Sequence, residues 1–302
     1  MRQHSKPGRH LNHASSGGGG HRLQELRFRV LGLVEVRRGG KPVSLAGQPS
    51  VNLLAGLLLS ANQPVSYASL ATIVWGDSLP AHPQAALQSL KSRLCRVLGE
   101  DAIQARGCGY QMPAQDDTLD LLRFWRLSRV ADAALSENSP HRALAALDQA
   151  LGLWQLPILA NVRSDVLLRD GVSFLMELYL GAQEKRAGLQ LRLGLYPAVI
   201  AELSGLVSAH PFREVLVGLL MLALYRSHRQ ADALAVYERL RQALRESLGV
   251  DPDEALQRLH LSLLRRDACL DQPDPAGELV RADVIPAEIP PLPRWQCMSA
   301  IS

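Results

Sequence analysis

The sequence predicts a mainly α-helical protein with a small β component, in which a compact unit of strands and three helices precedes an all-α array of helix pairs. Hydrophobic residues first alternate and then follow the helical period over residues 23–115, and they follow only the helical period over residues 119–268. The chain has 302 residues, of which 47% are hydrophobic and 21% charged, as in soluble globular proteins. This length suggests two domains, each large enough to bury its own core.

Two strand segments and two helices are predicted at the start of the first domain. Hydrophobic residues alternate with Arg and Glu over residues 26–36, a glycine turn follows, and residues 43–45 resume the pattern, so we expect an antiparallel meander. The apolar run over residues 51–59 predicts a buried helix. Ser66 is a good N-cap for a second short helix over residues 67–74. Two compact helices joined by a short polar turn are typical of a helix-turn-helix.

A third helix is predicted between Pro83, a favourable first-turn residue, and Gly99, a favourable C-terminal stop. Its apolar face consists of Leu87, Leu90, Leu94, Val97 and Leu98. The opposite face has no acid and has several hydrogen-bonding and basic side chains, of the kinds that bind the bases and phosphates of DNA. The predicted DNA-binding residues on this face and its flanks are Gln84, Ala85, Gln88, Ser89, Lys91, Ser92, Arg93 and Arg96.

A second alternating pair follows this helix. Residues 102–106 and 110–112 are separated by a bend that contains two glycines, which predicts a β-hairpin. The hairpin would bring Arg106 to the DNA backbone or the minor groove, and Tyr110 completes the predicted DNA-binding set. A basic amphipathic helix alone is more often a solvated helix. Strands, three helices and a hairpin in this order, however, suit a winged helix.

Basic charge is concentrated in the first 115 residues. Residues 1–22 carry four bases and no acid, and residues 23–115 carry nine bases and five acids, so each segment has a net charge of +4. Residues 116–270 have a net charge of −1, and residues 271–302 have −3. This asymmetry favours an anionic partner for the N-terminal part, with double-stranded DNA as the first candidate.

The second half of the chain contains an internal repeat. Residues 194–203 align with residues 228–237 at an offset of 34, the period of a tetratricopeptide repeat, and residues 139–147 are an imperfect earlier copy. Units of this kind are antiparallel helix pairs that must stack on neighbours. In the segment 248–252, we expect Asp251 to cap the last helix, with the following proline in its first turn.

Other classes of function lack support in the sequence. The chain has no HExxH, GxSxG or Walker pattern and no complete GxGxxG, so we expect neither an enzyme nor a bound cofactor. His82, Cys95 and Cys108 fit no structural zinc spacing, so we expect no metal site. The longest apolar run, Val215 to Leu224, is about half of a membrane span, and the first 22 residues have no apolar signal segment. We therefore expect a cytoplasmic protein with no membrane partner.

Several segments resemble one known family. The N-terminal ones are Leu31–Val36, Trp75-Gly76, Leu87-Gln88-Ser89, Ser92-Arg93-Leu94 and Gly109-Tyr110. The more specific C-terminal ones are His210-Pro211-Phe212-Arg213-Glu214, Leu222–Ser227, Arg229–Tyr237 and Leu248–Pro252. Over about residues 26–268 the chain thus resembles the SARP-type regulators, the antibiotic regulatory proteins of the AfsR/DnrI/RedD type.

The resemblance implies an OmpR-like winged-helix domain over residues 23–115 and a tetratricopeptide-like bacterial transcriptional activation domain over residues 116–270. A disordered basic tail, residues 1–22, and a disordered Pro-rich acidic tail, residues 271–302, would flank them. The family implies a sequence-specific activator that binds direct repeats near promoters and contacts RNA polymerase, with a homodimer on DNA.

Two segments depart from the family pattern. Residues 48–52 have no charge where the family usually has a basic start to the first helix, and Gln84-Ala85-Ala86 stands where the recognition helix usually opens with Arg-Asn-Thr. Both departures remove expected DNA contacts. The alternative hypothesis is therefore a helical-repeat adaptor or scaffold protein whose winged helix has lost DNA binding.

Overall fold

The computed structural model describes residues 26–271, so the two predicted tails lie outside the described residues, apart from residue 271. The first element is a three-stranded antiparallel sheet in the order β1-β2-β3, so the predicted meander is present. Its third strand is Lys41–Pro42 and not the predicted residues 43–45, because the chain resumes pairing directly after the glycine turn. Phe28 and Val36 lie opposite each other in the register of this sheet and are both buried. The predicted segment 26–36 is nevertheless not one strand, because residues 30–34 leave the sheet. The strands are β1 (Leu26–Arg29), β2 (Glu35–Arg38) and β3 (Lys41–Pro42).

The three predicted helices of the first domain are present. The Ser66 side chain accepts a hydrogen bond of 3.0 Å from the Ser69 backbone N–H, so Ser66 caps the second helix as predicted. The third helix ends before Gly99, whose φ of 116° favours glycine. These helices are α1 (Gln48–Leu59), α2 (Tyr67–Trp75) and α3 (Pro83–Leu98).

A second small sheet completes the winged helix. Its strand order is β4-β6-β5, and the β5–β6 hairpin is the predicted wing. The strands are β4 (Val65–Ser66), β5 (Gln104–Arg106) and β6 (Gly109–Gln111), with a short 3-10 helix, η1 (Glu100–Ala102), between α3 and β5.

Beyond the wing the described chain is helical. Three antiparallel helix pairs, α4/α5, α6/α7 and α8/α9, are followed by a single helix, α10. The bounds are α4 (Asp120–Ser136), α5 (Pro140–Leu151), the π-helical turn η2 (Leu167–Gly171), α6 (Val172–Arg192), α7 (Tyr196–Ala209), α8 (Glu214–Arg226), α9 (Gln230–Leu248), α10 (Glu254–Arg265) and the 3-10 helix η3 (Ala268–Asp271).

The turns inside the three helix pairs share one geometry. Asn138, Gly194 and His228 each stand two residues before a helix, and each has a positive φ, of 53°, 75° and 60°. In each turn the next residue donates its N–H to the carbonyl five residues earlier, at 2.8 to 2.9 Å, as in a Schellman motif. Gly194 and His228 are 34 residues apart, so the predicted repeat offset aligns two equivalent turns of the structure.

One predicted cap is wrong. The side chain of Asp253 accepts the hydrogen bond from the Leu256 N–H, at 2.7 Å, and α10 begins at Glu254. Asp251, which the sequence analysis assigned as the cap, forms an ion pair with Arg245 in the last turn of α9. Two aspartates two residues apart compete for this role, and the geometry of the turn decides between them.

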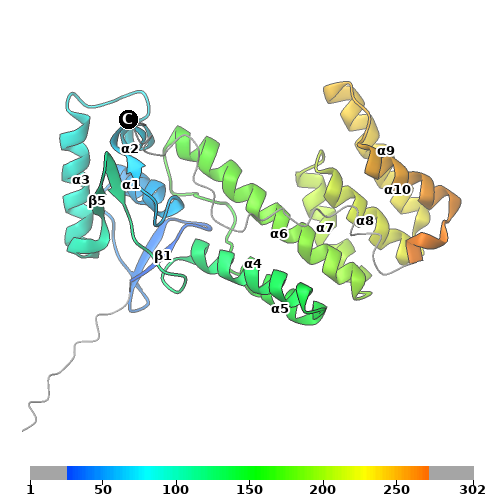
Figure 1. The fold of residues 1–302 in the computed structure, drawn as a ribbon. Helices are drawn as coiled ribbons and strands as arrows, with labels where there is room; N and C mark the ends of the chain where they lie inside the picture. The colour runs from blue at the N-terminus through cyan, green and yellow to red at the C-terminus, as the bar shows by residue number, and fades with distance from the viewer. Residues whose placement is uncertain (1–25, 272–302) are drawn as a thin grey trace, which may run out of the picture.

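The winged helix and the first helix pair share one continuous core. Buried side chains from β1 and α1 belong to the same cluster as those of α4, η2 and the start of α6. Trp125 and Trp154 are buried within this cluster, and both contact Phe124 edge to face. The winged helix lies at one end of the molecule, α4 to α6 lie in the middle, and α7 to α10 lie at the other end (Figure 1).

Backbone hydrogen bonds explain why residues 30–34 leave the sheet. The Asp120 carboxylate accepts N–H bonds from Val30, at 2.9 and 3.0 Å, and from Leu31, at 3.1 Å. The Asn161 side chain both accepts from the Val34 N–H, at 2.8 Å, and donates to the Val34 carbonyl, at 2.9 Å. The backbone groups of this loop are thus bonded to the helical half. This arrangement fixes the winged helix against α4.

No helix in the described range, residues 26–271, is long and apolar enough to cross a membrane.

Candidate nucleic-acid interface

The predicted recognition helix α3 has the two faces that its sequence indicates. Leu87, Leu90, Leu94 and Leu98 are buried in the core of the winged helix, and Val97 is partly buried against the same core. The opposite face is open to solvent. The exposed residues that the sequence analysis placed there are Gln84, Ala85, Gln88, Ser89, Ser92, Arg93 and Arg96.

The exposed face of α3 presents hydrogen-bonding groups without any acidic side chain. The hydroxyls of Ser89 and Ser92 donate to the carbonyls of Ala85 and Gln88, at 3.1 and 2.9 Å. Both serines would have to rotate before donating to a phosphate. Gln88 carries the one amide at the centre of this face, and amide groups of this kind pair with adenine.

Lys91 stands at the edge of the exposed face, above the wing. Its ammonium lies 5.6 Å from the centre of the Tyr110 ring, within the range of a cation–π contact. The Tyr110 ring in turn packs edge to face on Tyr67, with ring centres 5.0 Å apart. Tyr110 is only 5% exposed, so it supports Lys91 from below and is not part of the exposed surface. Burial also raises the pKa of the Tyr110 hydroxyl.

The wing is anchored to the start of α2. Val65 pairs with Tyr110 and Ser66 with Gly109 in an antiparallel ladder. A side chain at Gly109 would place its Cβ 1.8 Å from the Val65 carbonyl oxygen, so only glycine fits here. At the tip, Arg106 is exposed and its guanidinium donates to the Gln104 side chain at 3.0 Å.

One contact at the end of α3 was not predicted from the sequence. The Arg38 guanidinium of β2 donates to the Val97 carbonyl in the last turn of α3, at 2.5 Å. A cation at this position satisfies an orphan carbonyl and interacts favourably with the helix dipole. In the sequence, Arg38 is one of a pair of arginines before a turn, and nothing in that pattern indicates a contact with α3.

The uncharged segment at the start of α1 has a structural role. Gln48 donates to the Asn161 carbonyl at 2.9 Å, and Asn52 is buried and donates to the Arg163 carbonyl at 2.9 Å. These polar side chains therefore bond to the helical half of the protein.

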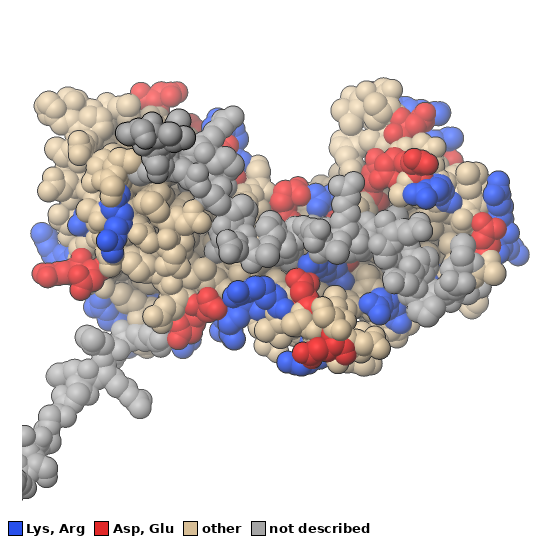
Figure 2. Space-filling view, viewed as in Figure 1, with Lys and Arg blue, Asp and Glu red and all other residues tan. Residues whose placement is uncertain are grey.

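The charged side chains are unevenly distributed over the surface. Lys and Arg side chains lie beside α3 in the view of Figure 2, with an acidic group below them. Glu100 and Asp101 follow α3 directly in η1. The bases of α3, which are Lys91, Arg93 and Arg96, therefore lie in its second half, and acidic charge begins where the helix ends. Within residues 26–271, no group of three His, Cys, Asp or Glu side chains is arranged to hold a metal ion.

Comparison with known proteins gives consistent matches. A family model described as a bacterial transcriptional activator domain matches residues 119–264. The regulatory protein AfsR of Streptomyces griseus is 36% identical over 269 residues, which cover 88% of this chain and 28% of that protein. The regulatory protein DnrI of Streptomyces peucetius is 30% identical over 261 residues, which cover 83% of this chain and 96% of that protein.

A solved structure is similar over most of the chain. The structure of EmbR from Mycobacterium tuberculosis, in complex with a low-affinity phosphopeptide, matches with a TM-score of 0.77 and 30% identity. The match covers 84% of this chain and 68% of that one. The chain thus spans about a quarter of AfsR but nearly the whole of DnrI.

Proposed function

The chain belongs to the SARP family of transcriptional regulators, and from that membership we propose that it is a sequence-specific DNA-binding activator of transcription. The observation that carries the proposal is the exposed face of α3, where amide, hydroxyl and guanidinium groups stand together with no acid among them. A recognition helix of a winged helix enters the major groove with a face of this kind.

The residues of the interface divide into two roles. We assign contacts with base edges to the exposed Gln84 and Gln88, and contact with a thymine methyl group to the small side chain of Ala85. Phosphate contacts are assigned to the cations and hydroxyls around them. These are Ser89, Lys91, Ser92, Arg93 and Arg96 on α3 and Arg106 on the wing. Tyr110 positions Lys91 through the ring contact.

The helical half is assigned to protein contacts. Stacked helix pairs offer extended surfaces for other proteins, and RNA polymerase is the partner that fits an activator. Because β1, α1 and α4 share one core, a contact made by the first helix pair would be held at a fixed position relative to the bound DNA. Two copies arranged head to tail would bind a direct-repeat site. The protein would act on the chromosome in the bacterial cytoplasm.

The Gln88→Ala variant tests the assignment of the reading face. Loss of the amide should weaken binding by ~1 to 3 kcal/mol at one base pair of the site, which is roughly 5- to 150-fold. Binding to random DNA should stay unchanged. Gln149→Ala is the matched control, because Gln149 is an exposed glutamine on α5, far from the wing.

The measurement is an anisotropy titration of both variants on the preferred site and on random DNA. Equal weakening on both DNAs would show that Gln88 does not read a base. No binding to any DNA by the unmodified protein would instead favour the adaptor hypothesis.

A further inference from the structure

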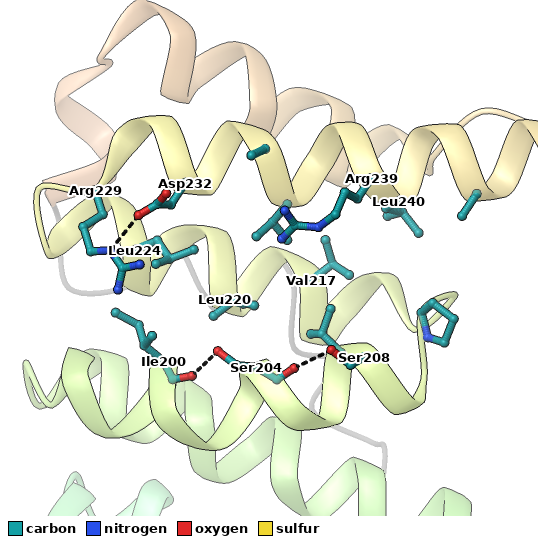
Figure 3. A pocket seen from close by; sticks show the side chains of 15 residues that line it. Ile200, Ser204, Ser208, Val217, Leu220, Leu224, Arg229, Asp232, Arg239 and Leu240 are labelled. Carbon is teal, nitrogen blue, oxygen red and sulfur yellow. Dashed lines mark hydrogen bonds and ion pairs between the residues drawn. The ribbon is translucent and has the colours of Figure 1, made fainter.

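The helical half contains a groove far from the winged helix (Figure 1). Helices α7 and α9 both pack on α8 and leave a cavity of about 520 Å³ between them (Figure 3). The size lies within the range of cavities that bind ligands. This groove is distant from the DNA-facing helix α3, which lies at the opposite end of the molecule (Figure 1).

The groove has an apolar floor and narrow walls. Val217, Leu220 and Leu224 of α8 form the floor. The α7 wall carries Ser204 and Ser208, whose hydroxyls both donate to carbonyls of their own helix, at 2.6 and 3.0 Å. The hydroxyls of the α7 wall are therefore already bonded, which suits an apolar occupant.

The charges along the groove are positive on balance. At one end Arg229 pairs with Asp232, at 2.7 Å, so the two charges cancel. Farther along α9, Arg239 extends over the groove and is exposed (Figure 3). Within residues 26–271 no ion pair or hydrogen bond joins the Arg239 guanidinium to another residue. An occupant with apolar side chains and a carboxylate would complement this surface.

The described region ends beside the last turn of α8, where Arg226 lines a neighbouring pocket with Tyr196 and Arg266. The Leu270 carbonyl accepts a hydrogen bond of 3.0 Å from the guanidinium of Arg226, the last residue of α8. Arg226 precedes Arg229, a lining residue of the groove, by three positions. Residues 272–302 therefore continue from a point close to the groove.

The composition of that continuation matches the groove. Residues 272–302 hold four acids and two bases. Three of the acids stand next to apolar residues, in Glu278-Leu279-Val280, Asp283-Val284-Ile285 and Glu288-Ile289. Each of these short segments combines a carboxylate, which could pair with Arg239, with branched aliphatic side chains, which could pack on the apolar floor.

We propose that the segment 278–289 of the same chain binds in the groove between α7 and α9, with one of its carboxylates paired to Arg239. Attachment to the same chain gives the segment an effective concentration of the order of millimolar, so even weak intrinsic affinity suffices for occupancy. The bound segment would cover a surface that would otherwise be open to other proteins.

Hydrogen exchange of the full-length chain, followed by mass spectrometry, tests this proposal. If the segment is bound in the groove, the backbone amides of residues 278–289 should exchange at least about threefold more slowly than in a free synthetic peptide of the same sequence. Arg239→Glu should abolish this protection. Arg258→Glu, the same charge change at an exposed position on α10 outside the groove, should leave it intact.

Three results would overturn the proposal. Exchange of residues 278–289 at the free-peptide rate would show that the segment is unbound. Equal loss of protection in both variants would show a general charge effect. Protection that rises with protein concentration would show that the groove holds the segment of a second copy.

Discussion

Replacement of Asp120 by Ala removes the side chain that holds the first half of the loop between β1 and β2 on the helical half. Its carboxylate accepts three hydrogen bonds from two backbone N–H groups, those of Val30 and Leu31. Both residues are 0% exposed, so water cannot replace the lost acceptor. An unsatisfied buried donor costs about 1 to 3 kcal/mol, and two donors give an expected loss of roughly 2 to 6 kcal/mol.

The same carboxylate should make stability depend on pH. Burial raises the pKa of Asp120 from 3.8 to about 6, although the backbone N–H bonds from Leu31 and Val30 act in the opposite direction. A raised pKa in the folded state means that the protonated form is favoured by folding. The stabilisation is full below about pH 4 and is lost as the pH rises through about 6, with a total of up to ~3 kcal/mol.

Urea denaturation at a series of pH values measures both effects. Asp120→Ala gives the cost of the unsatisfied donors, and Asp120→Asn gives a neutral reference whose stability lacks this titration. Asp117→Ala, an exposed acid in the same connection, is the control and should change the free energy of unfolding by less than about 0.5 kcal/mol. The winged helix and the start of α4 are expected to unfold in one transition, because they share one core.

Two results would refute this reasoning. A loss below about 1 kcal/mol in Asp120→Ala would show that the N–H groups find other acceptors. A constant difference between the unmodified protein and Asp120→Asn from pH 4 to pH 8 would show that burial does not raise the pKa of Asp120.

Three further predictions concern the DNA-binding end. Gly109→Ala should separate the wing from β4 and reduce DNA affinity, because the new Cβ would lie 1.8 Å from the Val65 carbonyl oxygen; circular dichroism should show that the helices persist. Tyr110→Leu keeps an apolar side chain in the core but removes the ring beneath Lys91, so binding to all DNA sequences should weaken by ~0.5 to 1 kcal/mol in an anisotropy titration. Arg96→Ala should weaken binding to all sequences and lower the slope of log affinity against log salt by about one, whereas an unchanged slope would show that Arg96 contacts no phosphate.

The sequence predicts those elements whose signals are local. The limits of α3 follow from Pro83 and Gly99, and the cap of α2 follows from Ser66. The repeat of helix pairs is equally readable, because Gly194 and His228 occupy equivalent turns with the same backbone geometry. Local chemistry at each of these positions is enough to determine the structure.

Other features depend on partners far along the chain. The break in the first strand is caused by Asp120 and Asn161, which are 90 and 127 residues away from the loop positions they bond. Asn52 is a polar residue, but it is buried. Its hydrogen-bond partner, the Arg163 carbonyl, is brought close only when the helical half packs on α1. Tyr110 belongs to a strand of three residues, too short for its pattern to show which face is buried.

The most direct test of the proposed function is the selection of binding sites from random DNA by the full-length protein, followed by titration of the selected site at two salt concentrations. The proposal predicts that a direct repeat is enriched and that it binds at least about a thousandfold more tightly than random DNA. Failure to enrich any sequence, together with weak binding that salt abolishes, would contradict the proposal. The function would then have to lie in the helical half.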